Sequence, residues 1–91
     1  MNTKKLKIIK SDQRGIVYQC GQNMFVSRKK GTITADHIHS DIAETIYLFK
    51  GTIELTIGKK VKKIIAPAKI KIPKKTYHKI LAISDIDFLK A

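Results

Sequence analysis

Short runs in which apolar and polar residues alternate fill most of this 91-residue chain. The clearest run is 52–57, where Ile53, Leu55 and Ile57 fall on one face of a strand and polar residues on the other. No run has the 3.6-residue period of an amphipathic helix. Such a chain can bury its apolar faces only by folding as an all-β sandwich or a small barrel.

The predicted strands are short, and residues typical of turns separate them. They cover residues 6–10, 15–20, 24–28, 33–39, 44–49, 52–57, 61–65, 69–72, 77–83 and 86–89. Isoleucine dominates the apolar residues, and β-branched side chains favour strands. Both faces of 44–49 are apolar, so we expect this strand to be covered on both sides, by a second sheet or by a partner subunit.

Length and composition indicate one domain that spans residues 1–91. Apolar residues make up 43% of the chain, which is enough to form a core. The single cysteine, Cys20, excludes an intramolecular disulfide and favours a reducing cytoplasm. Residues 2–10 are basic, and their apolar stretch is too short for a signal peptide. No apolar stretch is long enough to span a membrane.

The chain is strongly basic, with 19 Lys+Arg against 7 Asp+Glu and a net charge of +12. The lysines are spread along the whole chain, which argues against a basic tail. Arginine, the usual reader of bases, occurs only as Arg14 and Arg28. The aromatic residues do not have the regular spacing of a stacking platform. A nucleic-acid-binding module is therefore a disfavoured alternative.

All three histidines lie in two short motifs. The first motif is Gly31-x5-His37-x-His39-x4-Glu44-x6-Gly51, and the second is Pro73-x4-His78. His37 and His39 project from the same face of a strand, about 7 Å apart along the backbone. Glu44 follows a turn, and His78 must come from a distant strand.

Three imidazoles and a carboxylate suit a divalent transition metal. The alternative is that the histidines only fill the mouth of a barrel. Strict alternation would place Ile33 and Ala35 on the same face as the two histidines of the first motif. The residues expected to line the barrel are Ile33, Ile46, Leu48, Ile53, Leu55, Ile70, Ile72 and Ile80.

Residues 31–51 resemble the first motif of the cupin superfamily, G-x5-H-x-H-x3-4-E-x6-G, at every fixed position. Residues 66–82 are similar to the second motif, G-x5-P-x-G-x2-H-x3-N, at Pro73 and His78. They differ from it by lacking the first glycine and by having Lys75 and Ala82 in place of glycine and asparagine. The resemblance covers roughly residues 25 to 89, so the chain is identified as similar to small single-domain cupins.

The resemblance implies a small jelly-roll barrel, often a homodimer, with a metal in the barrel mouth. The matching ligands are His37, His39, Glu44 and His78, and the metal would be iron, manganese, nickel, copper or zinc. Lysine at 75 suits the turn only if its φ is negative, and a different turn would redirect His78.

Cupins include dioxygenases and isomerases that act on small organic molecules, as well as members without catalysis. The resemblance therefore implies a metal-binding protein that acts on a small molecule, with dioxygenase-like or isomerase-like chemistry. A non-catalytic ligand-binding or sensor protein is the alternative. Whether the chain is an enzyme stays open, and no catalytic residue or organic cofactor site is assigned.

Overall fold

The computed structural model describes residues 1–38 and 41–91, with the backbone alone described at residues 36–38. The described residues form strands and no helix, so none of them belongs to a helix that could cross a membrane. The strands are β1 (Lys7–Asp12), β2 (Gly15–Cys20), β3 (Asn23–Arg28), β4 (Ile33–Ile38), β5 (Glu44–Lys50), β6 (Thr52–Ile57), β7 (Lys60–Ile65), β8 (Ala68–Ile72), β9 (Tyr77–Ala82) and β10 (Ile86–Lys90). The all-β prediction is confirmed, and the predicted strands agree with these to within a residue or two.

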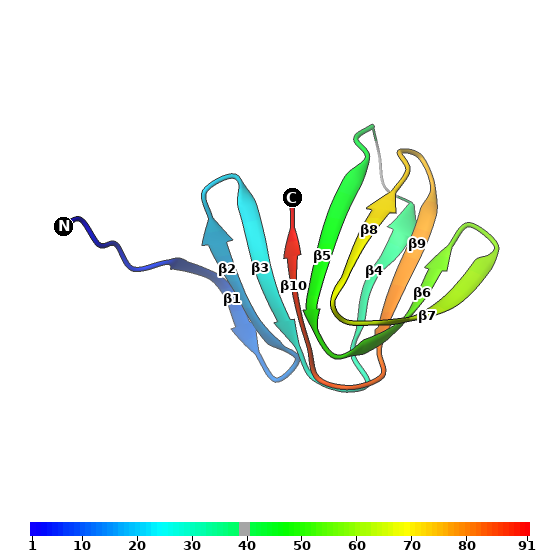
Figure 1. The fold of residues 1–91 in the computed structure, drawn as a ribbon, viewed down its shortest axis with the longest axis horizontal. Coiled ribbons are helices and arrows are strands. Elements are labelled where there is room, and N and C mark those ends of the chain that lie inside the picture. Colours follow the sequence, from blue (N-terminus) through cyan, green and yellow to red (C-terminus); the bar gives the residue numbers. More distant parts are fainter. Residues whose placement is uncertain (39–40) are drawn as a thin grey trace.

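The strands form two antiparallel sheets. One sheet has six strands in the order β1-β2-β3-β10-β5-β8, and the other has four in the order β4-β9-β6-β7. The C-terminal strand β10 runs between β3 and β5, so the end of the chain lies in the middle of the larger sheet (Figure 1). The N-terminal residues extend away from the body as an arm. This arrangement is the small jelly roll that the sequence predicts.

The core lies between the sheets and is built from alternate positions of both. It contains Val17, Val26, Ile46, Leu48, Ile53, Leu55, Ile70, Ile72, Ile80, Ala82, Ile86 and Phe88. Each fully buried aliphatic side chain of this kind contributes about 1.5–3 kcal/mol relative to an exposed one. The predicted lining is therefore confirmed, except at Ile33.

Ile33 is 50% exposed, so its predicted place in the core is wrong. The reason is a β-bulge in β4. Thr34 pairs with Ile80 and His37 pairs with His78, so three steps on β4 match two steps on β9. Ala35 takes a φ of 58° at this point. The extra residue shifts the pairing by one position, so strict alternation starting from Ile33 does not continue through the bulge.

The outer face of β5 is not fully covered within the chain. Phe49 is 58% exposed. Tyr47 is half-buried, and the Lys69 Nζ atom lies 5.7 Å from the centre of its ring. Within the chain, a second sheet therefore covers one face of β5 only, and cover of the other face by a partner subunit stays a prediction.

Candidate metal centre and ligand pocket

Glu44 and His78 face each other from opposite sheets. Glu44 begins β5 in the larger sheet, and His78 is the second residue of β9 in the smaller one. Both side chains are buried, and the Glu44 Oε2 atom lies 3.6 Å from the His78 Nε2 atom. The fold thus brings together two predicted ligands that are 34 positions apart in the sequence.

The other side of the His78 ring lies near a backbone carbonyl. The His78 Nδ1 atom lies 3.4 Å from the Thr76 carbonyl oxygen. Thr76 is itself held in the turn, because its hydroxyl donates to the Lys74 carbonyl at 3.0 Å. An Nδ1–H group that donates to a carbonyl leaves the Nε2 lone pair directed at Glu44. Imidazole and carboxylate are both metal-binding groups, so the donor chemistry of this pair suits a divalent metal ion.

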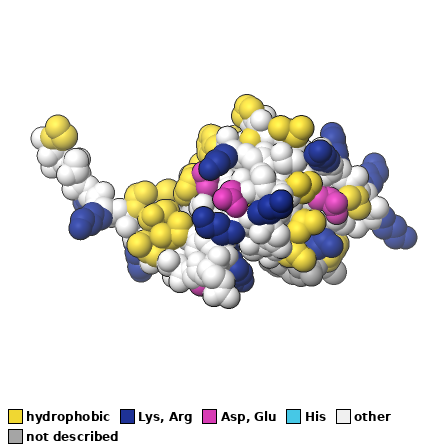
Figure 2. Space-filling model, turned by 90° about the horizontal axis from the view of Figure 1, so that it is seen from below, with side chains coloured by type: hydrophobic (Ala, Val, Ile, Leu, Met, Phe, Trp, Pro, Cys, Tyr) yellow, Lys and Arg dark blue, Asp and Glu magenta, His cyan; other side chains and the backbone are white. Residues whose placement is uncertain are grey.

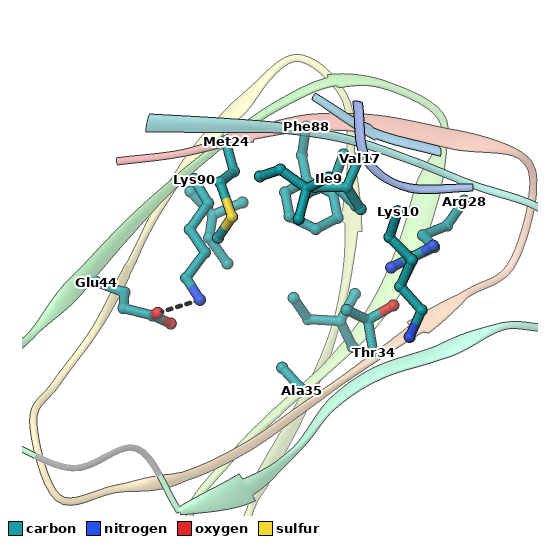
Figure 3. Close-up of a pocket in the computed structure, with 13 residues that line it drawn as sticks. Ile9, Lys10, Val17, Met24, Arg28, Thr34, Ala35, Glu44, Phe88 and Lys90 are labelled. Carbon is teal, nitrogen blue, oxygen red and sulfur yellow. Dashed lines mark ion pairs between the residues drawn. The ribbon is translucent and has the colours of Figure 1, made fainter. Parts of the chain in front are cut away.

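Lys90 holds the second oxygen of Glu44. The Lys90 Nζ atom lies 2.6 Å from the Glu44 Oε1 atom, and Figure 3 marks this ion pair. Lys90 ends β10, which neighbours β5 in the sheet. The short charge-assisted contact orients the carboxylate and leaves Oε2 on the His78 side.

The first motif reaches this site through the backbone of β4. Residue His37 stands directly opposite His78 in the β4–β9 register. Its side chain is not described, and His39 lies outside the described residues. Within the described part of the chain no group of three metal-binding side chains comes together. The predicted four-ligand set can thus be followed in full only at Glu44 and His78.

The turn before β9 places Lys75 in a left-handed conformation, which glycine adopts more easily than lysine. Lys75 has a φ of 56°, so the prediction that lysine requires a negative φ here is wrong. A left-handed lysine costs about 1–2 kcal/mol. The chain accepts this cost, and His78 is fully buried on the inner face of β9.

A cavity of about 210 Å³ lies beside this pair, between the two sheets. Most of its lining is apolar, and Figure 3 shows the side chains around it. The lining residues are Ile9, Lys10, Val17, Met24, Val26, Arg28, Thr34, Ala35, Glu44, Ile46, Ile80, Phe88 and Lys90. Glu44 therefore belongs to both the candidate metal centre and the pocket.

The sequence prediction did not include the polar residues Lys10, Arg28, Thr34 and Lys90. For two of them, the alternation of residues in the sequence indicates a side chain that faces inward. Arg28 follows Met24 and Val26 at two-residue spacing, and Lys90 follows Ile86 and Phe88 in the same way. A cation at the end of an inward-facing apolar series is expected at the rim of a core.

No protein-family model matches the chain, and no curated protein matches it by sequence. Solved structures do match it by fold. An RmlC-like cupin from Shewanella frigidimarina superposes with a TM-score of 0.83 at 13% identity, over 94% of this chain and 81% of that one. The chain has the cupin fold.

Two other solved structures share this cupin fold within longer chains. The capsular polysaccharide assembling protein CapF from Staphylococcus aureus matches 97% of this chain at 17% identity and a TM-score of 0.78. Salicylate 1,2-dioxygenase from Pseudoaminobacter salicylatoxidans matches 81% at 15% identity and a TM-score of 0.68. The chain spans only 30% of CapF and 19% of the dioxygenase. These matches establish architecture and leave activity to be argued from the site.

Proposed function

We propose that this cupin domain binds a divalent transition metal and acts on a small organic molecule. The proposed ligands are His37, His39, Glu44 and His78. The observation that carries the proposal is the buried Glu44–His78 pair, 3.6 Å apart, at the edge of an apolar cavity. Iron, manganese, nickel, copper or zinc all suit such a donor set.

When bound, the metal would polarise a substrate or bring an oxidant to it at open coordination positions. The chain's own residues do the remaining work. Lys90 orients the Glu44 carboxylate, and the Thr76 carbonyl orients the His78 ring. The mostly apolar walls lower the local dielectric, which strengthens charged interactions beside them.

The proposed reaction is dioxygenase-like or isomerase-like. Isomerases of this fold that use a separate histidine base are disfavoured, because every histidine of the chain belongs to the two motifs. The alternative is a non-catalytic ligand-binding or sensor domain. The small apolar cavity favours this second candidate as well, and it would bind a molecule without turnover.

A basic nucleic-acid-binding module is the remaining alternative. Figure 2 shows lysine and arginine side chains spread over one face of the molecule and not gathered into a stripe. Together with the spread of the lysines along the whole sequence, the view of this face favours general solubility over a nucleic-acid footprint. Binding that falls steeply with salt and is unaffected by His78→Ala would support this third function.

We also propose that the domain is a homodimer located in the cytoplasm. The dimer is supported by apolar side chains that the chain leaves exposed on the larger sheet and its arm, at Leu6, Ile8 and Phe49. Figure 2 shows hydrophobic side chains gathered where the arm joins the body. The cytoplasmic location rests on the single cysteine, Cys20.

The two glutamates of the chain allow a matched test of the metal proposal. Glu44→Gln removes the proposed ligand, whereas Glu54→Gln makes the same change on β6, where residue 54 alternates with the buried Ile53 and Leu55. Elemental mass spectrometry of protein purified without chelators should find about one metal per chain in the native protein and in Glu54→Gln. We expect Glu44→Gln to lose at least about tenfold in metal affinity.

The same measurement on His78→Ala should also show loss of the metal. No stoichiometric metal in the native protein, even after reloading with each candidate metal, would refute the proposal. The histidines would then be structural, and the non-catalytic alternative would take precedence. The identity of a bound metal would select the reactions to screen, because iron indicates oxygen chemistry.

A further inference from the structure

Arg28 is a buried cation in the pocket that the proposed metal site does not use. It ends β3, follows Met24 and Val26 on the inner face, and is only 9% exposed. Its side chain lines the cavity of about 210 Å³. In Figure 3, Arg28 and Lys10 lie on the side of the pocket away from Glu44 and Lys90.

The Arg28 guanidinium lacks a counter-ion among the described residues. Its Nη1 atom is fully buried there without a hydrogen-bond partner. The nearby carboxylate of Asp12 is engaged by Arg14 at 2.8 Å, and that of Glu44 by Lys90 at 2.6 Å. A buried charged donor without an acceptor is unfavourable.

The electrostatic surroundings of Arg28 also make its buried charge unfavourable without an anion. Burial lowers the pKa of Arg28, and the nearby Arg14 charge lowers it further. Arginine nevertheless keeps its proton inside proteins. The charge therefore persists in the pocket, and Lys10 adds a second cation to the same wall. An anion placed there would offset both the desolvation of Arg28 and its repulsion by Arg14.

The remaining walls limit the size and polarity of that anion. They are apolar, and they include Val26, Ile80 and Phe88 from both sheets. A cavity of about 150 Å³ is enough to hold benzene. A cavity of about 210 Å³ therefore suits a ring or short aliphatic body that carries one small head group.

We propose that Arg28 binds the carboxylate of a small organic acid whose apolar body extends across the pocket toward Glu44. The planar guanidinium fork matches a carboxylate in a bidentate geometry. Inorganic phosphate would leave the apolar walls unfilled and would carry a larger desolvation cost. The inference deepens the proposed function by naming a substrate class, and it rests on that function in taking this pocket as the ligand site.

Calorimetric titration with benzoate, its neutral analogue benzamide, and inorganic phosphate tests this assignment. The native protein should prefer benzoate to benzamide by about tenfold or more. Arg28→Met should abolish that preference, and Arg28→Lys should retain part of it. Arg14→Met is the matched control, because Arg14 is the only other arginine, is exposed and does not line the pocket.

Melting temperatures provide a second readout that requires neither metal nor turnover. Without ligand, Arg28→Met should melt higher than the native protein, because it removes a buried charge that has no partner in the described part of the chain. Benzoate should raise the melting temperature of the native protein and leave that of Arg28→Met unchanged.

Three results would overturn the inference. They are equal benzoate affinity in the native protein and Arg28→Met, no benzoate binding by the folded native protein at millimolar concentration, and tighter binding of phosphate than of benzoate. Titrations of metal-free protein and of protein reloaded with each candidate metal separate the two proposals. Arg28-dependent binding of benzoate without binding of any candidate metal refutes the metal site alone, and metal binding without Arg28-dependent binding of benzoate refutes the organic-acid site alone.

Discussion

Three residues in or near the pocket have a conformation or a degree of burial that is unusual for their residue type. Lys75 and Ala35 occupy left-handed conformations at φ values of 56° and 58°. Arg28 carries a charge into the interior. Departures of this kind from local rules concentrate at functional sites, where the rest of the fold compensates for their cost. All three lie at the pocket or in the turn that leads to His78.

Asp12 and Arg14 form the turn between β1 and β2 and supply a pH prediction. The hydrogen bonds from the Arg14 side chain and backbone lower the pKa of Asp12 from 3.8 to about 2. Because the folded-state pKa lies below the ordinary value, the stabilisation is complete above about pH 3.8 and is lost as the pH falls toward 2. We expect the Asp12 carboxyl carbon to titrate near pH 2 by NMR.

Arg14→Met provides the check on that cause. It removes the main partner of Asp12, so the midpoint should move up toward 3.8. An unchanged midpoint in this variant would show that the Arg14 side chain is not responsible.

A bulge in β4 and the connection at Gly51 determine where the strands place the residues of the site. The bulge in β4 places residue 37 opposite His78 in the β4–β9 pairing. The connection at Gly51 brings the start of β6 against the segment before β10. There the Thr52 amide donates to the Ser84 hydroxyl at 3.0 Å, and the Ala66 amide donates to the Gly51 carbonyl at 2.9 Å. The first motif therefore ends at a junction that ties the two sheets together.

Gly51→Ala should destabilise the domain far more than Gly58→Ala. Both glycines have a left-handed φ, of 92° and 59°. A Cβ atom at Gly51 would lie 2.2 Å from the Asp85 carbonyl oxygen, whereas one at Gly58 would meet nothing within 4 Å. Urea denaturation should show a loss of about 1–2 kcal/mol for Gly58→Ala and of about 3 kcal/mol or more for Gly51→Ala. Equal losses would mean that the junction yields easily.

The larger sheet of the molecule has exposed apolar side chains and an unpaired edge strand. All residues of β1 are exposed, and β1 is an edge strand of that sheet. Exposed edges with apolar side chains favour pairing with another chain. A second copy is the proposed partner, because a closed dimer would cover the exposed apolar residues of both copies at once.

Light scattering should therefore give twice the chain mass. Ile8→Lys on β1 should shift the protein toward the monomer, because it places a charge in the proposed interface. Val61→Lys is the matched control, since Val61 is 61% exposed on the edge strand of the other sheet and Ile8 is 53% exposed. A monomeric native protein, or an equal effect of both variants, would contradict the homodimer proposal.

The sequence by itself determined the all-β class, the position of nearly every strand and the candidate ligands. Alternation sufficed at Ile53, Leu55 and Ile80, because a two-residue period directly reflects which face of a strand is buried. The spacing of Glu44 and His78 in the two motifs predicted a shared site, and the fold brings these two residues together.

Only the tertiary structure decided which residues surround that site. The bulge at Ala35 depends on pairing with β9, and a local pattern has no information about a distant partner strand. Arg28 shares its cavity with residues of β1, of β5 and of the opposite sheet, which lie far from it in the sequence. Contacts between residues far apart in the chain arise only when the sheets close. Local alternation could therefore indicate that Arg28 and Lys90 face inward, but not which residues meet in the pocket.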